Sequence, residues 1–186
     1  MDLTRLYADA TAVSGQAAPV KTWNPPFCGD IDMRIAWDGT WFYNGTPILR
    51  PNMVQLFARI LRKEGESYFL VTPVEKVGIT VEDAPFIAVD MTVANTPDQT
   101  LTFRTNVGDI VTADAHHLLR FQTAPDGGFI PYIEVRDKLY ARLSRTLAQD
   151  LAALSTVVVH DGEDWLAVSS SDTVFPIQPV GALYDT

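Results

Sequence analysis

The chain is poor in the residues that build disulfides, metal sites and anion-binding surfaces. Cys28 is the only cysteine, so no internal disulfide can form. Of the three histidines, His116 and His117 are adjacent and would face opposite sides of a strand, so the sequence predicts no zinc site. Lys and Arg number 14 against 23 Asp and Glu, which gives a net charge of −9. This charge opposes a phosphate backbone and argues against nucleic acid as a partner.

Long apolar runs are missing as well. No window approaches the run of about 18 apolar residues that a membrane-spanning helix needs, so the sequence predicts no membrane span. Residues 1–5 contain no basic stretch followed by an apolar one, and together with the single cysteine this favours a cytoplasmic protein. Hydrophobic residues make up 47% of the chain, which is ordinary for a stable globular fold.

A repeated order of elements is what the chain does contain. Two runs typical of strands, one amphipathic helix and two more such runs occur over residues 31–93 and again over residues 100–177. The helices are expected over residues 51–63 and 136–151. We therefore predict an α+β fold of two tandem related domains, each a curled antiparallel sheet packed on one helix.

Polar and proline-rich breaks predict the domain boundaries. Residues 1–26 are expected to form a short helix, over residues 3–13, and an extended strap, because two consecutive prolines near its end cannot continue a helix. Residues 27–94 form the first α+β repeat. Residues 95–186 form the second, which starts at the most polar break in the middle of the chain.

The strongest local signals are turns and helix stripes. Asp38-Gly39 and Asn44-Gly45 are typical of tight hairpins, because the central residues of such turns need positive φ. Pro51 suits the first turn of the first helix. A closing hairpin is expected between residues 157–160 and 165–168. Leucines that recur every four residues predict the second helix. These leucines are Leu139, Leu143, Leu147 and Leu151.

Six short segments, taken together, resemble a known family. They are CGDIDM at residues 28–33, DGTWFY at 38–43, LVTPVEKV at 70–77, VEDAPF at 81–86, TNVGD at 105–109 and PYIEVR at 131–136. The combined pattern resembles the bacterial family described as domain of unknown function 1285. The resemblance implies a duplicated core of two α+β domains, the second superficially similar to pleckstrin-homology-like folds. It also implies a nucleotide-type ligand between the domains and a part in signalling, and it carries no catalytic set.

Arginines are the best candidates for binding an anion, because a guanidinium forks onto phosphate or carboxylate with two hydrogen bonds. Arg50 precedes the first expected helix and Arg136 opens the second, and helix N-termini themselves favour anions. Arg34, on the first expected strand, is a third candidate. The alternative for each is a surface salt bridge.

Aromatic and charged residues in the first repeat complete the candidate site. Trp41 and Tyr43 lie two apart on an expected strand, so their rings share a face and could stack on a base. Packing in the core is the alternative for such a pair. Lys76 could assist in holding a negative charge. Glu75 precedes it and could serve as a general base, as could Glu82 or Asp83 further on, although solvated charges at a hairpin are the alternative.

These features favour a binding protein over an enzyme, since the sequence presents no nucleophile–base set, metal cage or phosphate loop. The leading hypothesis is a small-molecule-binding or sensor protein with an anionic, nucleotide-like ligand between its two domains. We expect no metal and no cofactor. The alternatives are a protein–protein interaction module and a carboxylate-based hydrolase.

Overall fold

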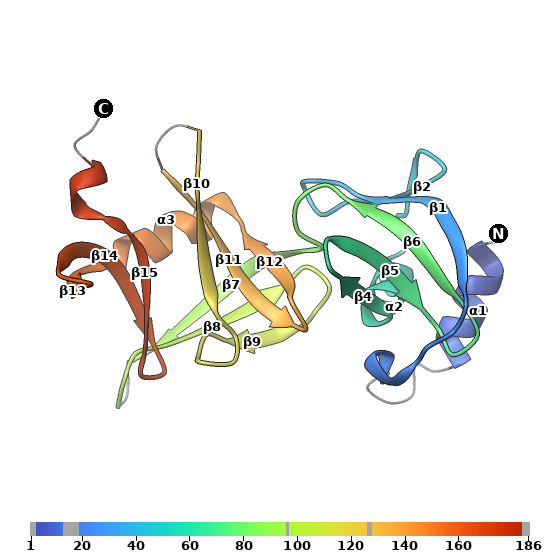
Figure 1. The fold of residues 1–186 in the computed structure, drawn as a ribbon, viewed down its shortest axis with the longest axis horizontal. Coiled ribbons are helices and arrows are strands. Elements are labelled where there is room, and N and C mark those ends of the chain that lie inside the picture. The colour runs from blue at the N-terminus through green and yellow to red at the C-terminus, as the bar shows by residue number, and fades with distance from the viewer. Residues whose placement is uncertain (1–2, 13–18, 96, 126–127, 184–186) are drawn as a thin grey trace. The chain divides into compact units, whose positions relative to one another are not determined.

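The computed structural model describes residues 3–12, 19–95, 97–125 and 128–183, which divide into two compact units (Figure 1). Unit 1 takes the described residues of Met1–Pro85 together with Asp137–Leu139. Unit 2 takes Phe86–Arg136 and the described residues of Tyr140–Thr186. None of the helices in these described ranges is long and apolar enough to cross a membrane.

Unit 1 is a six-stranded sheet with its helices. The strands are β1 (Phe27–Ile35), β2 (Trp41–Tyr43), β3 (Thr46–Pro47), β4 (Leu61–Glu64), β5 (Ser67–Val71) and β6 (Lys76–Val81). The helices are α1 (Leu3–Ala12), the 3-10 helix η1 (Val20–Thr22) and α2 (Pro51–Arg59). The strand order is β3-β2-β1-β6-β5-β4, in which β1 and β6 run parallel and all other neighbours run antiparallel.

Local signals specified the first turns of this sheet correctly. Gly39 has φ +84 in the turn between β1 and β2, and Asn44 and Gly45 have φ of +47 and +73 between β2 and β3. Both predicted hairpins are therefore confirmed. The predicted helix α1 is present, but Val13 and residues 14–18 of the expected N-terminal segment lie outside the described residues.

The helix expected over residues 51–63 begins at Pro51 as predicted but ends at Arg59. The remaining residues of that range belong to β4, which pairs with β5 along its length. Phe57, on the buried side of α2, packs against Trp41 and Tyr7, with ring centroids 6.4 Å away in both cases. These contacts fix α2 and α1 on the core of the first sheet.

Unit 2 contains a second sheet with the same strand order. Its strands are β7 (Phe86–Ala94), β8 (Thr100–Thr105), β9 (Ile110–Thr112), β10 (Leu119–Thr123), β11 (Phe129–Arg136) and β12 (Leu139–Leu143). Their order is β10-β11-β12-β7-β8-β9, with β7 and β12 parallel. Both sheets thus consist of two three-stranded antiparallel groups, joined by parallel pairing of the first strand with the last. The fold is α+β with two tandem mixed sheets, and the one parallel pair in each departs from the antiparallel sheets expected.

The position of β7 changes the boundary between the halves. The first repeat was expected to end at residue 94, but β7 pairs with β8 on one side and with β12 on the other. The second sheet therefore begins at Phe86. The strand was assigned to the wrong half because its two partners lie later in the chain and leave no local signal.

The range 136–151, in which one helix was expected, contains a strand followed by a helix. Asp137 and Lys138 have φ of +49 and +63 in a turn, β12 follows, and the helix α3 (Arg145–Ala153) begins only at Arg145. Leu139 and Leu143 are both buried on β12. A spacing of four residues fits one face of a strand as well as one face of a helix, which explains the error.

Unit 2 also contains a third sheet. It consists of β13 (Thr156–His160), β14 (Glu163–Ser170) and β15 (Thr173–Pro179), followed by the 3-10 helix η2 (Val180–Leu183). All three strands are antiparallel neighbours in that order. The predicted closing hairpin is confirmed, since β13 and β14 pair across a turn in which Asp161 and Gly162 have positive φ.

Candidate ligand-binding site

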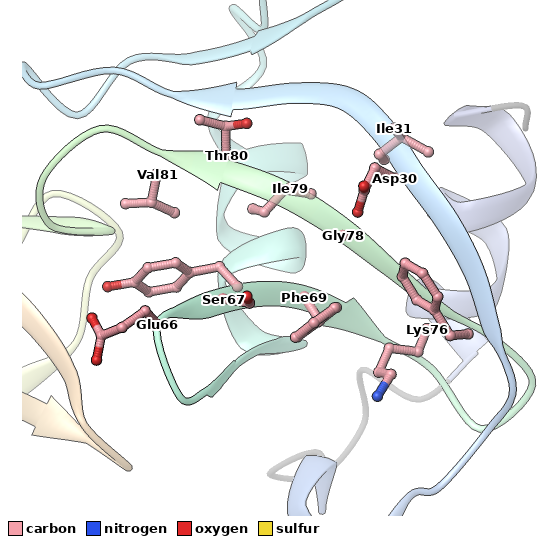
Figure 2. Close-up of a pocket in the computed structure, with 12 residues that line it drawn as sticks. Asp30, Ile31, Glu66, Ser67, Phe69, Lys76, Gly78, Ile79, Thr80 and Val81 are labelled. Atoms are coloured by element: carbon pink, nitrogen blue, oxygen red, sulfur yellow. The ribbon is translucent and has the colours of Figure 1, made fainter.

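Unit 1 carries an open pocket of about 710 Å³ on its sheet. Residues of β1, β5 and β6, with Glu66 from the turn between β4 and β5, form its lining (Figure 2). The volume lies in the range of typical small-molecule sites. Phe27, Ile31, Phe69 and Ile79 give the lining apolar surface, and charged and hydroxyl-bearing side chains supply a similar share of it.

The close approach of Asp30 to Gly78 shapes the middle of this pocket. A Cβ atom at Gly78 would lie 1.9 Å from Asp30 Oδ1, so only glycine leaves room for the carboxylate there. The pairing of β1 with β6 shifts register on both sides of Asp30, and Gly29 has φ +94. This irregularity directs the Asp30 carboxylate across the neighbouring strand and into the pocket (Figure 2).

Lys76 supplies positive charge at one end of the pocket. Its Nζ lies 3.0 Å from Glu64 Oε2 and 4.8 Å from the centroid of the Phe69 ring. Burial opposes ionisation of Glu64, but hydrogen bonds from Lys76 and Arg62 outweigh it, and the pKa of Glu64 falls below its usual value. Phe27 meets Phe69 edge to face at 5.9 Å. An ammonium is thus held beside a pair of aromatic rings.

The other end of the pocket combines hydroxyl groups with a second carboxylate. Figure 2 shows Glu66 at the opposite end from Lys76, near Ser67. Glu66 Oε2 lies 3.5 Å from Nζ of Lys63. Burial raises the pKa of Tyr68, which keeps its phenol protonated. The pocket therefore offers one ammonium, two carboxylates and several hydroxyls around an apolar floor.

Of the six residues predicted to bind a ligand, Lys76 lines this pocket. Arg34 instead pairs with Glu82 and lies 4.3 Å above the ring of Phe42. Glu82 also accepts the backbone N–H of Trp37 at 2.8 Å. That hydrogen bond, followed by the one from Arg34, lowers the pKa of Glu82. These contacts match the salt-bridge alternative for Arg34.

The predicted aromatic pair on β2 divides between core and surface. Trp41 is buried and stacks on Phe57 at an interplanar angle of 24°, which matches the packing alternative. Its Nε1 has no hydrogen-bond partner among the described residues. Tyr43 is half-buried near the end of the same strand.

The other two predicted arginines have different surroundings. Arg50 is exposed and directly precedes α2, as expected. It occupies the N-cap position, but its side chain makes no capping hydrogen bond. Arg136 ends β11 rather than opening a helix, so the expected equivalence of the two residues is wrong. Its Nη1 donates to Asp109 Oδ2 at 2.9 Å, and its guanidinium lies 5.1 Å from the Phe86 ring.

The carboxylates proposed as general bases have separate surroundings. Glu75 is only 3% exposed, and its Oε1 has no hydrogen-bond partner among the described residues. Glu82 is held by Arg34 and the backbone of Trp37. In the parts of the chain that the structure describes, no group of three His, Cys, Asp or Glu side chains could hold a metal ion.

Comparisons with known proteins match both units. The model "Domain of unknown function (DUF1285), N-terminal domain" matches residues 18–84, and "Protein of unknown function (DUF1285), C-terminal domain" matches residues 85–177. A DUF1285 family protein from Silicibacter pomeroyi DSS-3 has a crystal structure similar to this one, with a TM-score of 0.86 and 50% sequence identity. That match covers 96% of this chain and 97% of the other.

A second crystal structure, of a DUF1285 family protein from Shewanella baltica OS155, is similar with a TM-score of 0.51 and 31% identity. This match covers 63% of this chain and 87% of the Shewanella baltica chain. No curated protein matches the chain. The boundary between the two matched models, at residues 84 and 85, falls within one residue of the division between the two units.

Proposed function

We propose that this chain, which belongs to the DUF1285 family, is a small-molecule-binding or sensor protein whose ligand occupies the pocket on the first sheet. The observation that carries the proposal is the contact of Asp30 with Gly78, where a side chain would close the space that the carboxylate uses. A carboxylate directed over bare backbone beside aromatic rings is a prepared acceptor for ligand hydroxyl groups.

A nucleotide-like ligand with one anionic group fits the charges of this pocket. Phe69 and Phe27 offer apolar ring surface for a base, and Lys76 offers an ammonium for phosphate. Asp30 could accept hydroxyl groups of a ribose. Because Asp30 and Glu66 bring two negative charges to the lining, a monophosphate suits the pocket better than a triphosphate.

Binding is favoured over turnover because of how the ammonium is held. Lys76 is engaged with Glu64 and with the face of Phe69. This arrangement fixes a positive charge at one end of the pocket, whereas a nucleophilic lysine needs its charged form to be disfavoured. A ligand-controlled role in signalling in the cytoplasm is the wider form of the proposal.

The test is isothermal titration of the full chain with a nucleoside monophosphate, the matching nucleoside and inorganic phosphate. Lys76→Met should weaken binding of the monophosphate at least about tenfold, which corresponds to about 1.4 kcal/mol. It should leave binding of the nucleoside nearly unchanged, because the nucleoside has no phosphate for the ammonium to hold. Asp30→Asn should weaken both. Lys21→Met, which removes an ammonium outside the pocket, is the matched control.

The predicted arginine site can be separated from this pocket in the same titrations. Arg50→Ala and Arg136→Ala remove the two guanidinium groups that the sequence favours. If these variants lose phosphate-dependent affinity while Lys76→Met keeps it, the proposed pocket is wrong and the arginines bind the anion. Equal losses in Lys76→Met and Lys21→Met would indicate a general charge effect and would also contradict the pocket.

A further inference from the structure

The strand β13 presents an open sheet edge. It pairs with β14 on one side, and no strand lies on its other side in the described part of the chain. Val157 and Val159 alternate along it, so they share one face, and they are 59% and 76% exposed. Exposed valines next to unpaired backbone groups are the features by which an edge strand recruits another strand.

The other sheet edges carry the protection that β13 lacks. The edge strand β3 has two residues and includes Pro47, and β9 has three residues. The edge strands β4 and β10 carry charged side chains, Arg62, Lys63 and Glu64 on one and Arg120 on the other. The edge strand β15 carries Pro176 and Pro179, which have no backbone donor. Among the six edges that the structure describes, β13 alone has five residues with no proline and no Asp, Glu, Lys or Arg.

We propose that β13 pairs antiparallel with β13 of a second copy of this chain about a two-fold axis at Val158. This register sets Val157 of each copy against Val159 of the other, and Thr156 against His160. The sequence Thr-Val-Val-Val-His is nearly symmetric about its centre, so one register serves both chains. A head-to-tail contact would need a second open edge of similar length, and the other described edges are protected.

The architecture of the other sheets supports a second copy of the chain as the partner of β13. Each of them joins two three-stranded groups edge to edge, whereas β13, β14 and β15 form a single group. Pairing of two copies would make a six-stranded sheet of the same size. Because only five residues per chain form the seam and the chains carry −9 each, the dimer should be weak and should be promoted by salt.

Sedimentation velocity of the full chain at moderate salt tests for the dimer. The concentration should run from about 10 µM to about 1 mM, because a small interface is expected to associate weakly. Val159→Lys should raise the dissociation constant by at least about tenfold, because it places ammonium groups in the seam. Val174→Lys is the matched control, since Val174 is 51% exposed on the proline-protected edge of the same sheet. A wild-type chain that stays monomeric throughout, or equal effects of the two substitutions, would overturn the proposal.

A crosslink can test the register independently. In a Cys28→Ser background, Val158→Cys places the introduced thiols opposite one another across the proposed axis. Mild oxidation should give a covalent dimer with this variant and not with Val174→Cys. Faster crosslinking of Val174→Cys would overturn pairing through β13, and thermal melting of each variant will establish that it is folded.

Discussion

Tyr140 lies between a carboxylate and a guanidinium. Its hydroxyl donates to Glu134 Oε2 at 3.1 Å, and the guanidinium of Arg120 lies 4.8 Å from its ring. Burial, followed by the charge of Glu134, raises the pKa of Tyr140 to about 12. The phenol is therefore held in its neutral form well above the pH at which an exposed tyrosine ionises.

This environment predicts a loss of stability in alkali. In the unfolded chain Tyr140 releases its proton near its ordinary pKa of about 10, whereas the folded chain keeps the proton up to about 12. The stability that the protonated phenol of Tyr140 contributes is fully present below pH 10, and it is lost as the pH rises through the pKa of the folded state. Between those pH values, the free energy of unfolding measured with urea should fall more steeply with pH for the wild type than for Tyr140→Phe. Parallel losses in the two proteins would contradict the assignment.

Glu75 is a second residue whose surroundings make a prediction. It is 3% exposed, and its Oε1 has no hydrogen-bond partner among the described residues. Since a buried carboxylate without full pairing is costly, Glu75→Met should raise the free energy of unfolding by roughly 1 kcal/mol. Glu66→Met, at a fully exposed side chain, should change it by less than about 0.5 kcal/mol. A clear loss of stability in Glu75→Met would show that the carboxylate has a stabilising role.

The residues of the candidate pocket show what local reasoning can reach. Lys76 was identified because a charge in a polar hairpin is visible in the sequence. Asp30 and Gly78 were missed, since their contact depends on the parallel pairing of β1 with β6, 48 positions apart along the chain. The glycine in an otherwise regular strand was the available signal, because such a residue often marks a close approach by another group.

At the scale of single elements, α3 depends on the N-cap residue that precedes it. The hydroxyl of Ser144 accepts the backbone N–H of Leu147 at 3.4 Å and so caps the helix. Ser144→Ala should lower the free energy of unfolding by about 1 kcal/mol, and Ser144→Asp should retain most of it. Thermal unfolding and hydrogen exchange of the α3 amides measure both effects. Equal melting of the alanine and aspartate variants would show that the cap contributes nothing.

The elements predicted correctly are those whose signals lie within a few residues. The turns at Gly39 and Gly45 and the start of α2 at Pro51 need only local backbone chemistry. The errors concern β4, β7 and β12, which are strands because of their partners. Residues 61–63 continue the helical stripe in the sequence, yet pairing with β5 outweighs it.

Across the whole molecule, the two large sheets share a strand order but place their helices differently. In unit 1, α2 connects the two three-stranded groups, whereas in unit 2 a loop makes that connection and α3 follows the finished sheet. The parallel pair that joins the groups is therefore the constant part of the repeat. The predicted duplication is present in the strands, but the helix does not repeat with them.

The net charge of −9 also acts on the molecule as a whole. Like charges repel over about 30 Å at 0.01 M salt and over about 8 Å at 0.15 M, so salt should stabilise the folded chain at pH 7. Ion pairs such as Arg104–Asp90 are exposed, and their weakening by salt should be the smaller effect. We expect the melting temperature to rise by a few degrees over this range when measured at a concentration too low for dimers. At pH 5, close to the isoelectric point of about 4.6, the rise should shrink, because the repulsion that salt screens is then largely neutralised. A melting temperature that falls with salt at pH 7 would mean that the ion pairs, rather than the excess of carboxylates, dominate the electrostatics of the fold.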